Sequence, residues 1–187
     1  MRKIVKCLVA ALVWGVAVCA PSAFAGGLAE VQAALNQLYP EWTASNVGDI
    51  SGNGNRDCGL HNGVISIHPL STAVPATLTR VGSITGTYPV LHLRVASVAN
   101  ATSKSPSGDW VLKVRANGMQ IWANTTIASM AVLDFKIPLA AWANTGDVKL
   151  EVDNAAGGAA SWNWELGFWH LIKIEEDESA YRNDNVT

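Results

Sequence analysis

The sequence predicts an all-β protein, an antiparallel β-sandwich preceded by one short helix. After residue 40 the chain consists of short runs rich in Val, Ile and Leu, separated by Gly, Asn, Ser and Thr. Several of these runs alternate apolar and polar residues, which is typical of half-buried strands. Asn117-Gly118 is a strong hairpin signal, because a type I′ turn requires positive φ at both central positions. Many short strands joined by such turns indicate a sandwich.

A helix is expected only near the start of this region. Leu28, Val31, Leu35 and Leu38 recur at the spacing of one helical face, and Pro40 ends the pattern. We therefore expect a short helix over residues 28–38.

The strands are predicted from their two-residue period. They are expected at residues 64–68, 76–84, 90–98, 110–116, 119–124, 132–137, 147–153 and 164–175. Alternation assigns to the core Leu91, Leu93, Val95, Trp110, Leu112, Val114, Leu133, Phe135, Ile137, Val148, Leu150 and Val152. In the last strand Leu166, Phe168, Ile172 and Ile174 are expected to face the core. Trp169 then lies on the opposite face, either as an exposed platform or covered by a loop or by the N-terminal helix.

The first 25 residues resemble an export signal. Arg2, Lys3 and Lys6 precede an apolar run over residues 8–18, and Ala23-Phe24-Ala25 fits the rule for a cleavage site. The apolar run is too short for a membrane span, and no later segment is long enough. We expect a signal peptide (1–25), an N-terminal helical segment (26–45), a sandwich (46–175) and an acidic, disordered tail (176–187). The protein is then secreted or periplasmic.

Charge and cysteine content limit the function. Cleavage removes three of the 13 basic residues and none of the 15 acidic ones, which leaves a net charge of −5. Nucleic-acid binding requires a basic surface, so this balance argues against it. Cys58 is the one cysteine outside the signal, so an internal disulfide is excluded, and we expect a small buried apolar side chain there.

The main functional signal is a cluster of tryptophans. Residues 161–170 read Ser-Trp-Asn-Trp-Glu-Leu-Gly-Phe-Trp-His, and they include Trp162, Trp164 and Trp169. Indole combines a flat apolar face with one N–H donor, which suits stacking on a sugar ring as well as packing between sheets. Asn163, Glu165 and His170 are candidates to hydrogen-bond sugar hydroxyls.

A second candidate site is a loop rich in oxygen side chains. Asp49, Ser51, Asn53, Asn55 and Asp57 occupy alternate positions, with Gly54 where a calcium loop bends sharply. The twelfth position is Leu60, where an EF-hand places a Glu. The loop is therefore either an Asn/Gly-rich surface turn or a site for one structural calcium ion.

Catalytic motifs are not evident in the sequence. Asp109, Asp134, Asp153 and Glu165 are carboxylates, but nothing pairs two of them as a glycosidase requires. The sequence lacks a Gly-x-Ser-x-Gly elbow, a phosphate loop and a dinucleotide fingerprint. His61, His68, His92 and His170 lack the spacing of zinc ligands.

Several segments resemble the galactose-binding-like β-sandwich domains, including NPCBM-like carbohydrate-binding modules. The resemblance covers about residues 57–175. It is carried by Asp57-Cys-Gly-Leu60, Ile65-Ser-Ile-His-Pro-Leu70, Pro75-Ala-Thr-Leu-Thr-Arg80, the run from Asp109 to Gly118, and the run from Trp162 to Trp169. It implies an antiparallel jelly-roll, often with a structural calcium ion, and a sugar site at loop ends or on one sheet. This module makes up nearly the whole mature chain.

We therefore expect an exported, non-catalytic protein that binds a glycan or polysaccharide through tryptophan stacking at a loop-end site. The alternative is a structural or adhesion subunit of the cell envelope or of an extracellular assembly, with edge strands and the helix as interfaces for itself or an envelope protein. A glycoside hydrolase is a third alternative.

Overall fold

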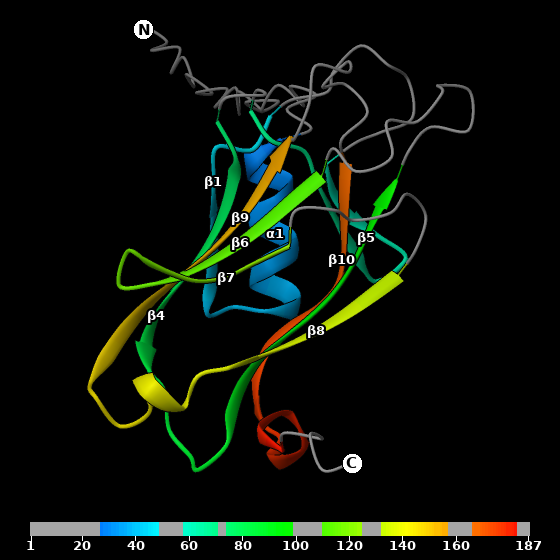
Figure 1. Cartoon of the computed structure of the whole chain (residues 1–187). Helices are drawn as coiled ribbons and strands as arrows, with labels where there is room; N and C mark the ends of the chain where they lie inside the picture. Colours follow the sequence, from blue (N-terminus) through cyan, green and yellow to red (C-terminus); the bar gives the residue numbers. More distant parts are fainter. Residues whose placement is uncertain are drawn as a thin grey trace, which may run out of the picture.

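The computed structural model describes residues 27–48, 58–70, 74–98, 110–124, 132–156 and 166–182. One α-helix and ten strands make up most of this part of the chain (Figure 1). In chain order the elements are α1 (Leu28–Leu38), β1 (Trp42–Ser45), β2 (Gly59–His61), β3 (Val64–Ile67), β4 (Ala76–Ser83), β5 (Pro89–Val98), β6 (Trp110–Ala116), β7 (Met119–Asn124), β8 (Val132–Pro138), the 3-10 helix η1 (Ala140–Trp142), β9 (Asp147–Ala156), β10 (Leu166–Glu176) and the 3-10 helix η3 (Glu178–Tyr181).

The strands form two five-stranded antiparallel sheets. Their orders are β1-β4-β9-β6-β7, called sheet A here, and β2-β3-β10-β5-β8, called sheet B. The predicted antiparallel sandwich with a short N-terminal helix is therefore confirmed. No helix among the described residues is long and apolar enough to cross a membrane.

Alternating side chains build the core between the sheets. On β5, Leu91, Leu93 and Val95 are fully buried, whereas Arg94 between them is exposed. Five of the residues predicted to face inward on β6 and β9 are also buried: Leu112, Val114, Val148, Leu150 and Val152. These assignments followed from the two-residue period alone, and the structure confirms them.

The hairpin between β6 and β7 forms where the sequence predicts it. Asn117 has φ of 49° and Gly118 has φ of 81°, the left-handed values that the turn requires. The Asn117 side chain also accepts a hydrogen bond from the backbone N–H of Lys149 at 2.9 Å, which ties the turn to β9.

The helix α1 closes one side of the sandwich and covers the edge of sheet A. It contacts β1, β2 and β3, and Val31 and Leu35 on its inner face are fully buried. The side-chain amide of Gln32 lies against the free edge of β1. It accepts a hydrogen bond from the Ala44 N–H at 2.8 Å and donates one to the Trp42 carbonyl at 3.3 Å. A helix side chain thus supplies the contacts that a neighbouring strand would make.

Two short strands were not predicted. Trp42–Ser45, expected within the helical segment 26–45, is β1 and pairs with β4; Gly59–His61 is β2 and pairs with β3. The Trp42 side chain is fully buried. Tertiary packing therefore determines these strands, because three or four residues carry too little periodicity to be recognised in sequence.

The start of the acidic tail is ordered, which corrects the expected disordered segment 176–187 as far as residue 182. Glu176 ends β10, and residues 178–181 form η3. The Asp177 N–H donates to the Tyr88 carbonyl at 3.0 Å, and the Tyr181 hydroxyl accepts from the Leu139 N–H at 2.9 Å. These contacts fasten the segment to the starts of β5 and η1.

Candidate functional site

The ends of several strands meet at one end of the sandwich, the upper end in Figure 1, which we call the loop end. Ala156 at the end of β9 pairs with Trp110 at the start of β6. Leu166 at the start of β10 pairs with Val98 at the end of β5. Figure 1 shows the end of β9 and the start of β10 at this end, so the two residues that flank segment 157–165 lie at the same end but in different sheets.

Most of the predicted sugar-binding residues belong to that segment. Trp162, Asn163, Trp164 and Glu165 lie outside the described residues, between Ala156 of sheet A and Leu166 of sheet B. The structure therefore defines the strands that flank these four residues.

Trp169 does not face the side that the sequence predicted. Its indole is 1% exposed and belongs to the core together with Ile172. The cause is a bulge: Trp169 pairs with Val95, but Leu171 already pairs with Arg94, so His170 is an extra residue in β10. The bulge reverses the parity, so Trp169 and Ile172 share the inner face. An indole in this position has no exposed face to stack on a sugar.

His170 occupies the bulge and is half-buried. Its carbonyl accepts a hydrogen bond from the Tyr39 hydroxyl at 3.1 Å, so the residue after α1 holds the irregular backbone. His170 lies four residues along β10 from Leu166, which is about 13 Å at the rise of a strand. It is therefore too far along the strand to join residues at the loop end.

The predicted calcium ligands Asp49, Ser51, Asn53, Asn55 and Asp57 also lie outside the described residues. The two residues that flank them are in contact, because the Cys58 thiol donates to the Gly48 carbonyl at 3.5 Å. Gly48 is in turn held by a hydrogen bond from its N–H to the His68 carbonyl at 2.9 Å. Cys58 is buried, as predicted for a small apolar side chain. No group of three or more His, Cys, Asp or Glu in the described part of the chain could hold a metal ion.

Buried polar residues lie in the core below the loop end. Asn154 follows Val152 on the inner face of β9 and is 1% exposed. Its amide donates to the Ile67 carbonyl at 3.3 Å and so links the two sheets, while its side-chain oxygen has no hydrogen-bond partner among the residues that the structure describes. His68 is fully buried, and its Nδ1 lies 2.6 Å from the Pro69 carbonyl. Sequence reasoning missed Asn154, although the parity that placed Val148, Leu150 and Val152 inward also places Asn154 there.

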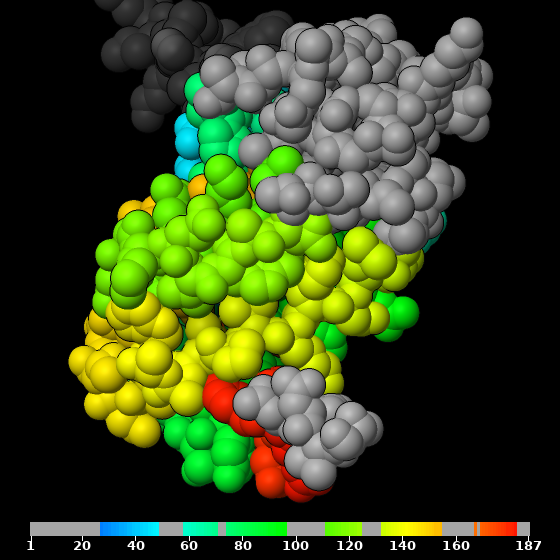
Figure 2. Space-filling model, viewed as in Figure 1, coloured from blue at the N-terminus to red at the C-terminus, as the bar shows by residue number. Residues whose placement is uncertain are grey.

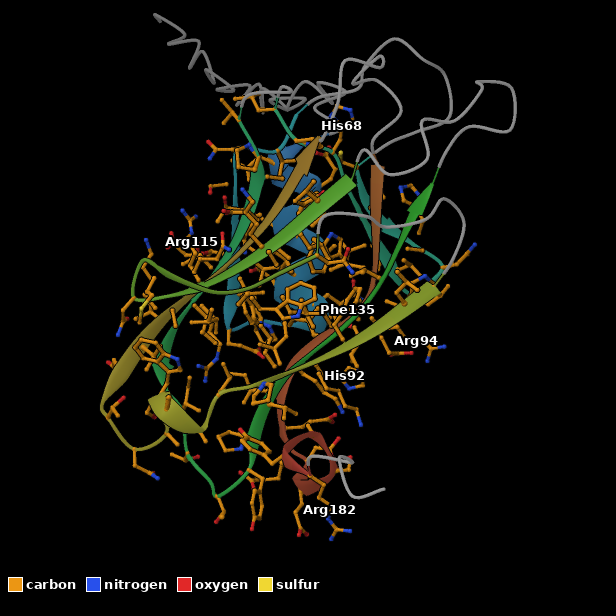
Figure 3. The ribbon with its side chains drawn as sticks, in the orientation of Figure 1. His68, His92, Arg94, Arg115, Phe135 and Arg182 are labelled. Carbon is orange, nitrogen blue, oxygen red and sulfur yellow. The ribbon has the colours of Figure 1, made fainter. Side chains whose placement is uncertain are left out.

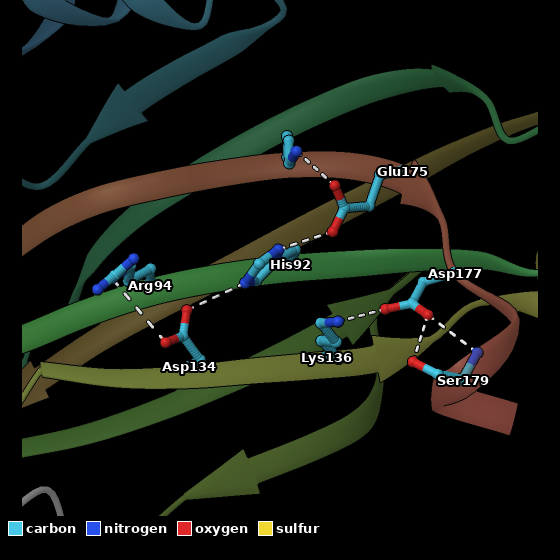
Figure 4. A network of polar contacts seen from close by, with 8 residues as sticks. His92, Arg94, Asp134, Lys136, Glu175, Asp177 and Ser179 are labelled. Carbon is cyan, nitrogen blue, oxygen red and sulfur yellow. Dashed lines mark hydrogen bonds and ion pairs between the residues drawn. The ribbon is translucent and has the colours of Figure 1, made fainter. Parts of the chain in front are cut away.

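The outer face of sheet B carries a connected set of charges (Figure 4). The His92 ring has Nδ1 2.7 Å from Glu175 and Nε2 3.1 Å from Asp134. Arg94 is 3.9 Å from the other oxygen of Asp134. Figure 3 shows Arg94 pointing away from the sheet. Since both ring nitrogens of His92 face carboxylates, the ring is engaged by its own sheet.

Sequence reasoning missed this network because its members come from three strands. His92 pairs with Lys136 on β8 and with Lys173 on β10, and the carboxylates lie diagonally beyond these partners. The alternation in the sequence places each of these charged residues on the outer face of its strand. It does not give the register between strands, which decides which charges meet. Lys136 and Lys173 also form ion pairs, with Asp177 and Glu175.

The carboxyl of Asp177 responds most strongly to these contacts. Hydrogen bonds from Lys136 and then from Ser179 lower its pKa from 3.8 to about 2. The ion pair also raises the pKa of Lys136, and a hydrogen bond from Lys173 lowers that of Glu175.

This shift predicts a dependence of stability on acid. Because the pKa of Asp177 is lower in the folded protein, its contribution is complete above pH 3.8 and is lost as the pH falls towards 2. We expect Asp177→Asn to flatten the loss of unfolding free energy over that interval, measured by urea unfolding at a series of pH values. Asp147→Asn, which removes a carboxylate from sheet A, is the control and is expected to keep the wild-type slope. An Asp177→Asn variant as acid-sensitive as the wild type would contradict the assignment.

Neither a protein-family model nor a curated protein matches the sequence. Similar solved structures exist, and carbohydrate-binding modules are among them. A family 35 module from an environmental isolate is 16% identical over 72% of this chain and 85% of its own, with a TM-score of 0.42. A family 51 module from Clostridium perfringens, in complex with methyl-galactose, is 16% identical over 75% and 97%, with a TM-score of 0.44.

A third similar structure is a family 61 module in complex with β-1,4-galactotriose. It is 12% identical over 74% of this chain and 84% of its own, with a TM-score of 0.36. All three TM-scores lie below 0.5. At this level of overlap these modules do not identify a ligand for the chain, so its function has to be derived from its own residues.

Proposed function

We propose that the chain is an exported, non-catalytic carbohydrate-binding protein with its site at the loop end. The observation that carries the proposal is the position of segment 157–165. Its flanking residues Ala156 and Leu166 end one strand in sheet A and begin another in sheet B, each next to a further strand end. A segment that joins two sheets at this end is well placed to present side chains to a ligand.

The composition of the segment supports a sugar as that ligand. Trp162 and Trp164 provide two flat apolar faces, and Asn163 and Glu165 provide hydrogen-bonding groups beside them. Stacking of an aromatic ring contributes about 1 kcal/mol beyond the burial of its area. Trp169 and His170 are not part of this proposed site, because one is buried in the core and the other lies further along β10.

We include one structural calcium ion, held by Asp49, Ser51, Asn53, Asn55 and Asp57, as a second element of the proposal. The contact between Cys58 and Gly48 brings together the two residues that flank these oxygen side chains. A loop with neighbouring ends suits a cation that takes six to eight oxygen ligands, and such an ion would support the loop end.

The test is binding of neutral oligosaccharides based on galactose, glucose, mannose or xylose, followed by intrinsic fluorescence and by calorimetry. We expect saturable binding of one class and a loss of about tenfold in affinity for Trp162→Ala or Trp164→Ala. Trp142→Phe, at the opposite end of the sandwich, is the control that alters a tryptophan away from the site and is expected to bind normally. Wild-type affinity in both alanine variants would overturn the proposed site.

The same titrations are run with calcium chloride and with a chelator. A fluorescence change caused by calcium without sugar, and lost in Asp49→Asn, is the result expected for the proposed metal loop. Identical unfolding temperatures in calcium and in chelator would exclude a structural ion.

A further inference from the structure

The strand β8 forms one edge of sheet B. Among the described residues only β5 pairs with it, and Figure 2 shows its residues at the surface between β7 and the C-terminal segment. Its side chains alternate. Leu133, Phe135 and Ile137 pack against the core, and Asp134 and Lys136 keep 49% and 41% of their side chains exposed.

The backbone of β8 presents a defined set of hydrogen-bonding groups at this edge. The Leu139 N–H donates to the Pro89 carbonyl at 2.8 Å, and the register pairs Ile137 with Leu91. Since hydrogen-bonded positions alternate along an antiparallel pair, odd-numbered residues of β8 bond to β5. Even-numbered residues therefore direct their groups to the free edge: N–H and carbonyl groups from Val132, Asp134 and Lys136, and the carbonyl alone from Pro138.

The charges of β8 are complementary to those of a second, antiparallel copy of the same strand. When two copies are centred on Phe135, each Asp134 lies opposite the Lys136 of the other copy. The same register places even-numbered residues opposite one another, so their outward N–H and carbonyl groups can exchange hydrogen bonds. Val132, which is 44% exposed, then lies opposite Pro138.

Other registers between two copies of β8 are less favourable. A shift of two residues in one direction places Asp134 opposite itself, and in the other direction it places Lys136 opposite itself, and like charges directly opposite are destabilising. A shift of one residue places even-numbered residues, whose backbone groups point to the free edge, opposite odd-numbered residues, whose groups bond to β5. The hydrogen bonds between the two copies are then lost. One register therefore satisfies both the backbone and the charges.

We propose that two copies of this protein associate through β8, so that sheet B continues across a two-fold axis. Each contact then occurs twice: Asp134 of one copy lies opposite Lys136 of the other, and Lys136 of the first lies opposite Asp134 of the second. A two-fold symmetric interface requires such reciprocal contacts. The exposed parts of Asp134 and Lys136 remain available, although Asp134 also contacts His92 and Arg94 and Lys136 contacts Asp177. The charges disfavour strands that place like charges opposite Asp134 and Lys136, and they favour a second copy of β8.

The test is charge reversal followed by mixing. Asp134→Lys gives two lysines on β8, and Lys136→Asp gives two aspartates, so each variant repels its own copy. We expect sedimentation velocity to show a concentration-dependent dimer for the wild type and a dissociation constant about tenfold or more higher for each variant alone. An equimolar mixture of the variants restores opposite charges at both positions and is expected to form a heterodimer.

The mixture distinguishes a lost interface from a damaged fold, because unfolded variants would not dimerise together. Asp147→Lys and Lys149→Asp make the same changes of charge on β9 and are expected to dimerise as the wild type does. A wild type that stays monomeric over the whole concentration range, or variants that stay monomeric when mixed, would overturn the proposal. The proposal would also be overturned if each β8 variant alone dimerised as strongly as the wild type.

Discussion

Replacement of Trp169 by Ala is expected to lower the free energy of unfolding by about 3–5 kcal/mol, the range for a large aromatic removed from a core. The indole is 1% exposed and lies in the core with Ile65, Val95 and Ile172. Since β10 is the central strand of sheet B and is paired on both sides there, the backbone has little freedom to close the resulting cavity.

Urea unfolding followed by circular dichroism measures this loss without depending on tryptophan fluorescence. Trp169→Phe, which keeps a ring, is expected to lose less than half as much as the alanine variant. His170→Ala, at the neighbouring half-buried position, is the matched control and should stay within about 1 kcal/mol. A Trp169→Ala protein as stable as the control would show that the bulge does not place the indole in the core.

Replacement of Asp153 by Ala is expected to lower the free energy of unfolding by about 2–3 kcal/mol, because it leaves the Thr77 hydroxyl without its acceptor and removes the nearer of the two carboxylates that contact Arg115. Asp153 lies on the outer face of sheet A yet is only 6% exposed. It accepts hydrogen bonds from Thr77 at 2.8 Å and from Arg115 at 3.0 Å, and so joins β4, β9 and β6. Figure 3 shows Arg115 on this sheet.

A double-mutant cycle isolates the pair from other effects of the substitution. Asp153→Ala and Arg115→Ala are measured singly and together, and the combined loss is expected to be clearly smaller than the sum. Lys149→Ala, four residues before Asp153 on the same face of β9, should have little effect because the Lys149 side chain is 51% exposed. Strict additivity would mean that Asp153 and Arg115 do not stabilise each other.

The strands that the sequence predicts best are those with one apolar and one polar face. In β5, β6 and β9 a charged residue between apolar neighbours marks the outer face, so the parity is unambiguous. Residues 168–172 of β10 read Phe-Trp-His-Leu-Ile and offer apolar side chains on both faces. An extra residue within such a run leaves no mark in the pattern, which is why the side that Trp169 faces could not be predicted.

Contacts between distant segments account for the other differences. Gln32 and β1, the His92 network, and the segment from Asp177 to Tyr181 all depend on residues brought together by register. The alternation of β9 places Asp153 on the outer face, and its side chain does lie there, but its neighbours on β4 and β6 cover it. The residues of the proposed site come from the sequence alone. The strand topology shows at which end of the sandwich their segment, residues 157–165, is attached.

The contact between Gln32 and β1 bears on how far an assembly of this protein could grow. A β-sheet with two open edges can add chains without limit, whereas one with a single open edge stops at a pair. The helix α1 lies against the strands on its side, β1 in one sheet and β2 in the other, and Gln32 occupies the hydrogen-bonding groups of β1. Pairing through β8 would therefore leave a helix-covered flank at each outer end. In sheet B the outer strand β2 lies against α1, so the proposed pairing would stop at two copies with two loop ends, and the two proposed sites of this divalent particle would bind a polymeric ligand with avidity.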